Sequence, residues 1–162
     1  MEDVYLLLGA NLADRETQLA KARDLCALEL GTLTRQSALY ESESWGGVGT
    51  QPEYLNQVIC VESALEPLEV LRIINNIETR LGRIRTIRWG ARVIDIDILF
   101  FGNRIVDLPD LQIPHLHFQE RNFAMVPMNE LMADLIHPRL GLTVGELLRA
   151  SADPLAVRVK RK

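Results

Sequence analysis

The sequence predicts an α+β protein with an antiparallel sheet. Two helical patterns, over 15–29 and 67–81, alternate with short runs of strand-forming residues. In the helical patterns, apolar residues recur every three or four positions, whereas the strand at 94–101 alternates apolar and acidic residues. The 162 residues are enough to bury a substantial core. We therefore expect a single domain over 1–162.

The first half of the chain alternates strand and helix patterns. An apolar run closed by Gly9 predicts a buried strand over 4–8. Asp14 can cap the helix over 15–29, because its carboxylate can accept hydrogen bonds from the first helical turn. Two strand-type runs follow, separated by a glycine-rich stretch, and they cover 32–41 and 55–62.

The second helix has the most regular pattern. Pro67 suits its first turn, and Gly82 ends it. Its apolar residues recur at helical spacing and predict one buried stripe, made of Val70, Ile74, Ile77 and Leu81.

The second half begins with the clearest strand, over 94–101. Gly102 marks a tight turn after it, and 104–106 could pair back as a hairpin. Two helical patterns follow, the first interrupted by Pro127, and they cover 122–133 and 144–150. The βαββαβ order predicts a ferredoxin-like sandwich with helices on one face of the sheet and a mostly helical C-terminal tail.

Composition excludes several classes of protein. The net charge is −4 and the pI is about 5.4, whereas a general nucleic-acid binder carries a basic excess. No apolar run reaches the ~18 residues of a membrane helix, and the first residues lack a secretory pattern. Cys26 and Cys60 lie in apolar segments, as buried reduced thiols do. We expect a cytoplasmic protein with no nucleic-acid or membrane partner.

Two acidic residues in the strand over 94–101 indicate a metal site. Because side chains alternate, Asp95 and Asp97 share one face, about 7 Å apart, while the apolar residues face the core. Paired carboxylates suit magnesium, which takes further ligands from phosphates. The alternative is that both aspartates are simply solvated. The residues facing the other way are Ile94, Ile96, Ile98 and Phe100.

An arginine-rich segment precedes the aspartates. Five arginines and no acid lie between Arg80 and Arg92, which favours a small anionic ligand over a polymer. Guanidinium groups match phosphate oxygens in pairs, so a polyphosphate bridged between metal and arginines is expected. Trp89 could cover a base or a flat substrate, and glycine-rich 46–49 is a candidate lid. The alternative is a solvated basic loop.

Other candidates carry weaker signals. His115 and His117 could form a zinc or di-metal site, although a phosphate contact by His115 is the better interpretation. Tyr54 and Asn56 share a strand face and could hold a polar heterocycle, or simply pack. A basic group near the C-terminus is explained by a solvated, frayed tail, and comprises Arg158, Lys160, Arg161 and Lys162.

These motifs resemble those of the 6-hydroxymethyl-7,8-dihydropterin pyrophosphokinases of folate biosynthesis. The stretch over 82–102 is similar to the family signature, which is RWGxR followed by DxD. Here residues 88–92 read RWGAR, and Asp95 and Asp97 form the DxD pair. The remaining matches follow in order and are Gly9-Ala10-Asn11, QPEYLN over 51–56, Pro114-His115, Arg121 with Phe123, and His137-Pro138. The sequence departs from the family pattern at Ala10, Glu43, Ala91 and 118–120.

The resemblance implies an ATP-dependent diphosphotransferase that releases AMP and binds two magnesium ions at Asp95 and Asp97. Arg83 and Arg92 would hold the transferring phosphates. The ATP site would comprise Leu71, Asn75, Glu78, Arg83, Arg85, Arg88, Trp89, Arg92, Ile98, His115 and Arg121. The pterin site would comprise Ser42, Glu43, Ser44, Trp45, Tyr54, Asn56 and Phe123. No obligatory protein partner is expected.

Two other classes of function stay open from the sequence. One is an RNA-binding module that uses the arginine segment, which would need exposed aromatic residues on the sheet. The other is a regulatory domain that binds ATP without turnover.

Overall fold

The computed structural model describes residues 1–12, 14–43, 53–82 and 94–161. It has a mixed α/β architecture with an antiparallel sheet, as predicted. In chain order, the elements are β1 (Glu2–Ala10), α1 (Arg15–Glu29), β2 (Thr32–Gln36), β3 (Tyr40–Ser42), β4 (Tyr54–Ser63), α2 (Pro67–Arg80), β5 (Asp95–Phe101), β6 (Val106–Leu108), β7 (Leu111–Ile113), a 3-10 turn (Phe118–Glu120), α3 (Asn122–Met132), α4 (Val144–Arg149) and β8 (Val157–Val159). Among the described helices, none is long and apolar enough to cross a bilayer.

The main sheet has six strands in the order β5-β1-β4-β3-β8, with β2 also paired to β4. Every pair is antiparallel, and β1 lies between β4 and β5. The strand expected over 32–41 is two strands. Ser37 separates them, because its hydroxyl accepts from the Val58 N–H at 3.0 Å and so interrupts the ladder.

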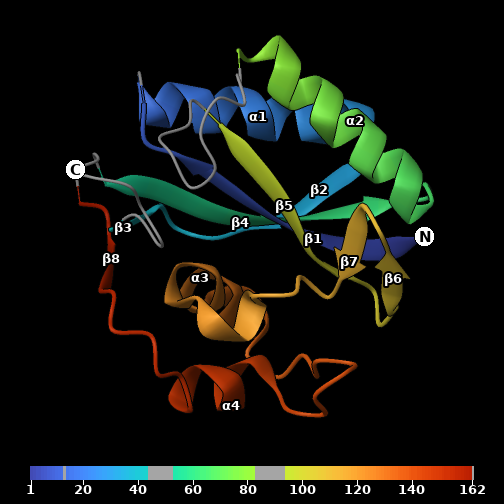
Figure 1. The fold of residues 1–162 in the computed structure, drawn as a ribbon. Coiled ribbons are helices and arrows are strands. Elements are labelled where there is room, and N and C mark those ends of the chain that lie inside the picture. The colour runs from blue at the N-terminus through green and yellow to red at the C-terminus, as the bar shows by residue number, and fades with distance from the viewer. Residues whose placement is uncertain (13, 44–52, 83–93, 162) are drawn as a thin grey trace.

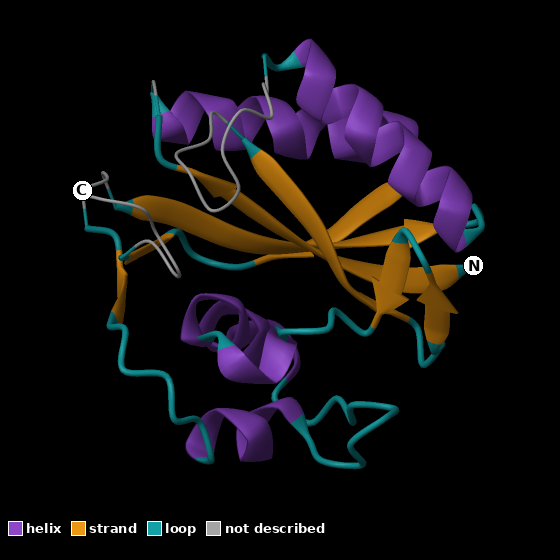
Figure 2. Cartoon of the chain, in the orientation of Figure 1, coloured by secondary structure: helices purple, strands orange, loops and turns teal. Residues whose placement is uncertain are grey.

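Helices cover both faces of the sheet, with α1 and α2 on one side and α3 and α4 on the other (Figures 1 and 2). The expectation of helices on one face is wrong. Both alternating sets of side chains along β1 are apolar, so each set requires a cover. Leu6 and Leu8 pack toward α1 and α2, whereas Tyr5 and Leu7 pack toward α3 and α4.

A β-bulge interrupts the pairing of β1 with β5 between Tyr5 and Leu6. Leu99 and Phe100 consequently both belong to the core beneath α3, and Phe101 joins the opposite core. The predicted placement of Phe100 beside Ile98 is therefore wrong. Asp95 and Asp97 precede the bulge and keep the predicted alternation.

The helix boundaries follow local signals. Asp14 caps α1 by accepting from Thr17, with 2.7 Å between the hydroxyl and carboxylate oxygens, and Pro67 opens α2 as predicted. Contrary to expectation, α3 continues through Pro127, whose missing N–H forfeits only one helical bond and whose ring is buried. Cys26 and Cys60 are free and buried, and burial raises the pKa of Cys26 to about 12.

The C-terminal third differs most from prediction. Gly102, at φ +54°, forms the turn after β5, but β6 then pairs with β7, so the expected hairpin of 104–106 with β5 is wrong. The mostly helical tail is not confirmed, since three strands accompany α3 and α4. Arg158 lies within β8, which pairs with β3, and Lys160 pairs with Glu16, so the expected frayed tail is wrong for these two residues.

Candidate active site

The candidate site lies where β1 ends and β4 and β5 begin. Gly9 of β1 pairs with Asn56 of β4 on one side and with Asp95 of β5 on the other. A Cβ atom at Gly9 would lie 3.2 Å from Asn56 Oδ1, closer than most Cβ contacts. Glycine therefore lets the amide and the strand approach each other at this point.

A first pocket of about 590 Å³ opens at this end of the sheet. The pocket contains every pterin residue predicted from sequence that the structure describes, together with both aspartates. Its lining comprises Leu7, Gly9, Ser42, Glu43, Tyr54, Asn56, Asp95, Asp97, Arg121 and Phe123.

Polar and aromatic groups in the first pocket suit a flat polar ligand. Asn56 is 2% exposed, and its Nδ2 donates to Ser42 Oγ at 2.7 Å, which fixes the amide orientation. Tyr54 contributes an aromatic ring from β4, and Phe123 contributes one from α3. Aromatic rings with a fixed amide are the groups that bind a planar heterocycle bearing hydrogen-bonding edges.

Among the described residues, a buried arginine lines the first pocket together with the two aspartates. Arg121 is 7% exposed, and its guanidinium lies 5.5 Å from the centre of the Phe123 ring. Burial lowers the pKa of Arg121, while Asp97 and Asp95 act in the opposite direction. The two carboxylates place several oxygen donors side by side in the first pocket, and such oxygens are the ligands that magnesium prefers.

A second pocket of about 730 Å³ adjoins the first, because Asp97 lines both. Of the described residues predicted for ATP, three line it, namely Leu71, Ile98 and His115. The other lining residues come from β5 and from 109–117, and are Ile96, Asp97, Pro109, Asp110, Leu111, Gln112, Leu116 and His117.

His115 is neutral at physiological pH. Burial is the main cause that lowers its pKa to about 4, with smaller contributions from Arg121 and His117. Its Nδ1 accepts from the His117 backbone N–H at 3.1 Å, which leaves the proton on Nε2, 4.0 Å from Asp97 Oδ2. A neutral ring makes no ion pair with Asp97. It offers an uncharged N–H donor beside the carboxylate instead.

The alternative of a histidine metal site finds no support in the described residues. Among them, no group of three or more histidine, cysteine, aspartate or glutamate side chains could hold a metal ion. His117 directs Nδ1 to Glu120 at 2.8 Å, and its ring centre lies 6.2 Å from that of His115.

Glu78 supports the strand that carries the aspartates. It is 3% exposed, and its Oε2 accepts from the Ile96 backbone N–H at 2.8 Å. Because β5 lies at the edge of the sheet that the described strands form, no described strand pairs with this N–H on that side. Ile96 lies between Asp95 and Asp97, so the contact fixes the backbone of both.

Several predicted residues fall elsewhere. The described lining of the second pocket includes neither Asn75 nor Glu78, and Arg121 lines the first pocket rather than the second. Sequence reasoning missed Leu7 and the segment 109–112, for which no motif gave a signal. The rest lie outside the described residues, and are Ser44, Trp45, Arg83, Arg85, Arg88, Trp89 and Arg92.

Solved structures share this fold. A structure titled as HPPK-DHPS in complex with substrates matches with a TM-score of 0.73 at 16% identity, covering 92% of this chain and 43% of that one. A Plasmodium falciparum HPPK-DHPS triple mutant matches with a TM-score of 0.72 at 19% identity. This chain thus spans less than half the length of these structural neighbours.

Comparison of sequences finds relatives with higher identity than these structures. A pyrophosphokinase named for 2-amino-4-hydroxy-6-hydroxymethyldihydropteridine, from Pseudomonas aeruginosa, is 40% identical over 151 residues, covering 93% of this chain and 92% of the relative. Its Haemophilus influenzae counterpart is 36% identical over 160 residues, covering 98% and 99%. A family model for 7,8-dihydro-6-hydroxymethylpterin-pyrophosphokinase (HPPK) matches residues 5–133. The chain therefore belongs to the 7,8-dihydro-6-hydroxymethylpterin-pyrophosphokinase family.

Proposed function

We propose that the first pocket binds the pterin and the second binds ATP, so that the two substrates meet at Asp97. The chain is an ATP-dependent pyrophosphokinase that acts on hydroxymethyldihydropterin in folate biosynthesis. The observation that carries the two-pocket assignment is that Asp97 lines both pockets. A group that passes from one substrate to the other must cross their shared boundary.

The first pocket has the chemistry that a pterin requires. Tyr54 and Phe123 would stack on the ring, and Asn56 would hydrogen-bond its polar edge while Ser42 holds the amide in place. Glu43 lines the same pocket, so its replacement of the usual family residue falls on the pterin side.

The second pocket has the chemistry that a nucleoside triphosphate requires. Leu71 and Ile98 offer apolar walls to the base, and the neutral Nε2–H of His115 would donate to a phosphate oxygen. Arg83 and Arg92, from outside the described residues, would hold the transferring phosphates. Asn75 and Glu78 remain predicted members of this side.

The reaction would be attack of the pterin hydroxymethyl oxygen on the β-phosphorus, with AMP as the leaving group. Asp95 and Asp97 would hold two magnesium ions. When bound, magnesium neutralises the charge that develops on the phosphates. Arg121 would keep the aspartates from repelling each other before the substrates arrive, since its guanidinium is buried beside them.

Two finer proposals accompany this assignment. The order with β1 between β4 and β5, and an α-helix after β1 and after β4, supports a ferredoxin-like core. The Pseudomonas aeruginosa and Haemophilus influenzae relatives align over nearly their whole length, which supports an enzyme that acts without an obligatory protein partner.

Nucleotide analysis tests the activity. The protein is mixed with ATP, magnesium and 6-hydroxymethyl-7,8-dihydropterin, and we expect AMP only when all three are present. ADP would indicate a simple kinase, and no product would favour the silent ATP-binding domain. The RNA-binding alternative is disfavoured already, because helices cover both faces of the sheet (Figure 2).

Paired variants test the assignment of the pockets. Phe123→Ala should weaken pterin binding and leave binding of α,β-methylene-ATP unchanged, because Phe123 lines only the first pocket. His115→Ala should do the reverse, because His115 lines only the second. Isothermal titration calorimetry measures both affinities. Loss of both ligands in either variant would contradict two separate pockets.

A further inference from the structure

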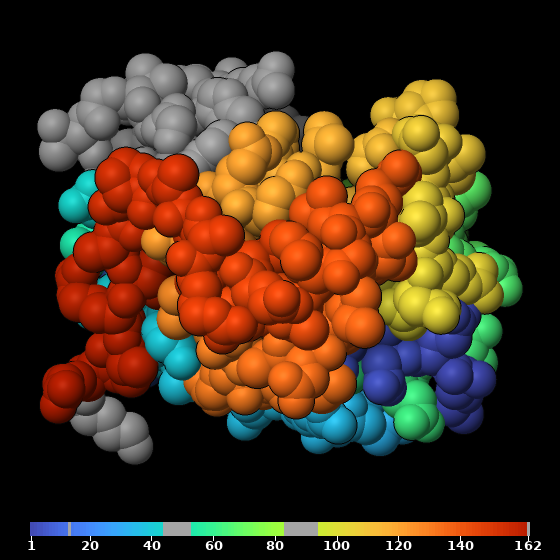
Figure 3. Space-filling view, turned by 90° about the horizontal axis from the view of Figure 1, so that it is seen from below, coloured from blue at the N-terminus to red at the C-terminus, as the bar shows by residue number. Residues whose placement is uncertain are grey.

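The chain beyond α4 runs up one side of the molecule, at the left in Figure 1, and joins the sheet as β8. We call residues 151–161 the C-terminal strap. Seen from the side of α3 and α4, this part of the chain, in red, passes along the helices toward the edge of the sheet (Figure 3). The match to the family model ends at residue 133, before the strap begins.

The strap first attaches to the start of α3. Asp153 Oδ2 accepts from the Asn122 backbone N–H at 2.8 Å, and Ser151 Oγ donates to Asn122 Oδ1 at 2.6 Å. Arg121 makes no side-chain cap for this helix, so a carboxylate from 31 residues away binds one of its free N–H groups. Phe123 follows immediately, so Asp153 fixes the backbone of one pocket wall.

The strap then attaches to the opposite wall. Val157 and Val159 of β8 pair with Ser42 and Tyr40 of β3, and the Lys160 backbone N–H donates to Leu39 O at 2.8 Å. Ser42 is the residue whose hydroxyl fixes the pocket amide. The position of that hydroxyl therefore depends on a strand held between β4 and β8.

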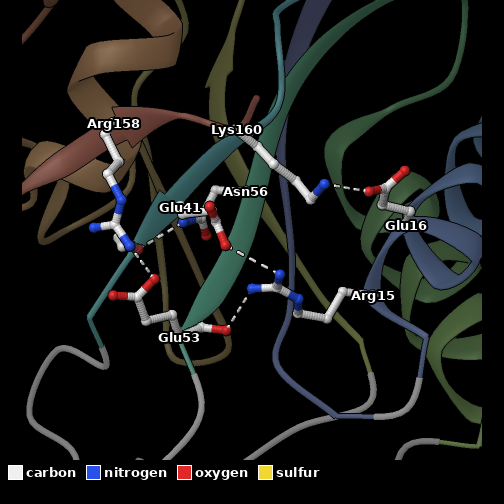
Figure 4. A network of polar contacts seen from close by, with 8 residues as sticks. Arg15, Glu16, Glu41, Glu53, Asn56, Arg158 and Lys160 are labelled. Carbon is white, nitrogen blue, oxygen red and sulfur yellow. Dashed lines mark hydrogen bonds and ion pairs between the residues drawn. The ribbon is translucent and has the colours of Figure 1, made fainter. Parts of the chain in front are cut away.

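Ion pairs reinforce the second attachment (Figure 4). Arg158 binds the Glu53 carboxylate, and this contact is the largest cause that lowers the pKa of Glu53. Arg15 of α1 donates to the Glu53 carbonyl at 3.0 Å and pairs with Glu41 at 3.0 Å. Lys160 adds a pair with Glu16 at 2.6 Å. Glu53 directly precedes Tyr54, so the contacts of Arg158 and Arg15 with Glu53 lie next to the β4 side of the pocket.

We propose that the C-terminal strap is a positioning element that sets the spacing of the pterin pocket. Its two attachments, at Asp153 and Val157, are four residues apart, a reach of at most roughly 14 Å. The walls bearing Phe123 and Tyr54 cannot separate further without breaking one attachment. Because stacking depends on wall spacing, the strap determines pterin affinity without touching the pterin. This inference rests on assigning the first pocket to the pterin.

The test compares point variants at each attachment, which avoids the risk that a truncated chain does not fold. Arg158→Ala and Asp153→Ala should each raise the KM for the pterin about 3- to 10-fold, which is the scale of one lost hydrogen bond. The KM for ATP should change less than about twofold, because the second pocket shares only Asp97 with the first. Arg158→Lys keeps the positive charge, and Asp153→Asn keeps an oxygen that can accept the hydrogen bond. In both variants the KM for the pterin should lie close to the wild-type value.

A matched control is available at the far end of the sheet. Arg104 pairs with Glu2 and Glu66, each at 2.7 Å, and Glu2 lies at the opposite end of β1 from Gly9, roughly 25 Å away. Arg104→Ala should leave both KM values unchanged. Equal shifts of the pterin and ATP KM values, or an unchanged pterin KM in the strap variants, would overturn the inference.

Asn56→Ala, measured alongside, separates the assignment of the first pocket to the pterin from the positioning role of the strap. If it weakens pterin binding but the strap variants do not, the pocket assignment stands and the positioning role fails. If it leaves pterin binding intact, the pocket assignment fails and the strap inference fails with it.

Discussion

Truncation of Asn56 to alanine tests the chemistry of the first pocket most directly. The side chain is 2% exposed, its Nδ2 lies 2.7 Å from Ser42 Oγ, and it lines the pocket. The variant removes an internal hydrogen bond and also the amide edge that we assign to the pterin. The two losses are measured separately, one as stability and the other as affinity.

The structure sets the size of each effect. Loss of the bond to a buried Ser42 hydroxyl should lower the free energy of unfolding by about 1–3 kcal/mol. Loss of one or two hydrogen bonds to the pterin should cost a similar free energy of binding, which is a roughly 10- to 100-fold weaker Kd. Affinity for α,β-methylene-ATP should stay within about twofold, since Asn56 does not line the second pocket.

Calorimetric titration measures the affinities for the pterin and for α,β-methylene-ATP, and urea unfolding measures the free energy of unfolding. Ser42→Ala is the matched control, because it removes the same internal bond but leaves the amide. It should reproduce the stability loss with a smaller loss of pterin affinity. An Asn56→Ala protein that binds the pterin normally, or that loses both ligands equally, would refute the assigned role.

Three further predictions concern charge, pH and backbone. Asp97→Asn should lower kcat by roughly 100-fold or more, because a phosphate-neutralising metal is worth several kcal/mol. The free energy of unfolding without ligand, measured in urea, should change little, since Asp95 still lies beside Arg121. His137 is buried, and burial lowers its pKa in the folded state. Its neutral form therefore contributes stability above about pH 6.5 that is lost as pH falls through the folded pKa. In His137→Asn, the free energy of unfolding measured across pH 4–8 should depend less steeply on pH than in the wild type. At Gly31, an added Cβ would lie 2.1 Å from the Glu62 carbonyl oxygen; Gly31→Ala should therefore cost about 1–3 kcal/mol by thermal unfolding, and an unchanged Tm would contradict the clash.

Much of the site could be predicted from local sequence. The alternation that places Asp95 beside Asp97 is a property of one strand, and it holds because both residues precede the bulge. Tyr54 and Asn56 also occupy alternate positions on one strand, and both line the first pocket. The caps of α1 and α2 depend on Asp14 and Pro67, which act within one turn.

Other features depend on residues far apart in the chain. Glu78 reads as an ordinary helical residue, yet it binds the Ile96 N–H because α2 packs beside the edge of β5. Phe100 changes sides because one extra residue enters β5 relative to β1, and no local propensity specifies that register. The core beneath α3 and α4 was missed because β1 reads as a continuous apolar run. Such a run shows that the strand is buried, but it does not show which elements cover each of its two faces.

The sequence by itself determined the two central helices, the aspartate pair and the family to which the chain belongs. The helices and the aspartate pair depend on residues that are neighbours in the chain, where spacing fixes geometry, and the family is recognised from several short motifs of this local kind. Tertiary structure alone decided that Asp97 lines two pockets, that Arg121 lies buried beside it and that Arg158 belongs to a strand rather than to a frayed tail. These arrangements arise from packing and hydrogen bonds between segments as much as 105 residues apart, as in the contact of Arg158 with Glu53, and no local periodicity encodes them.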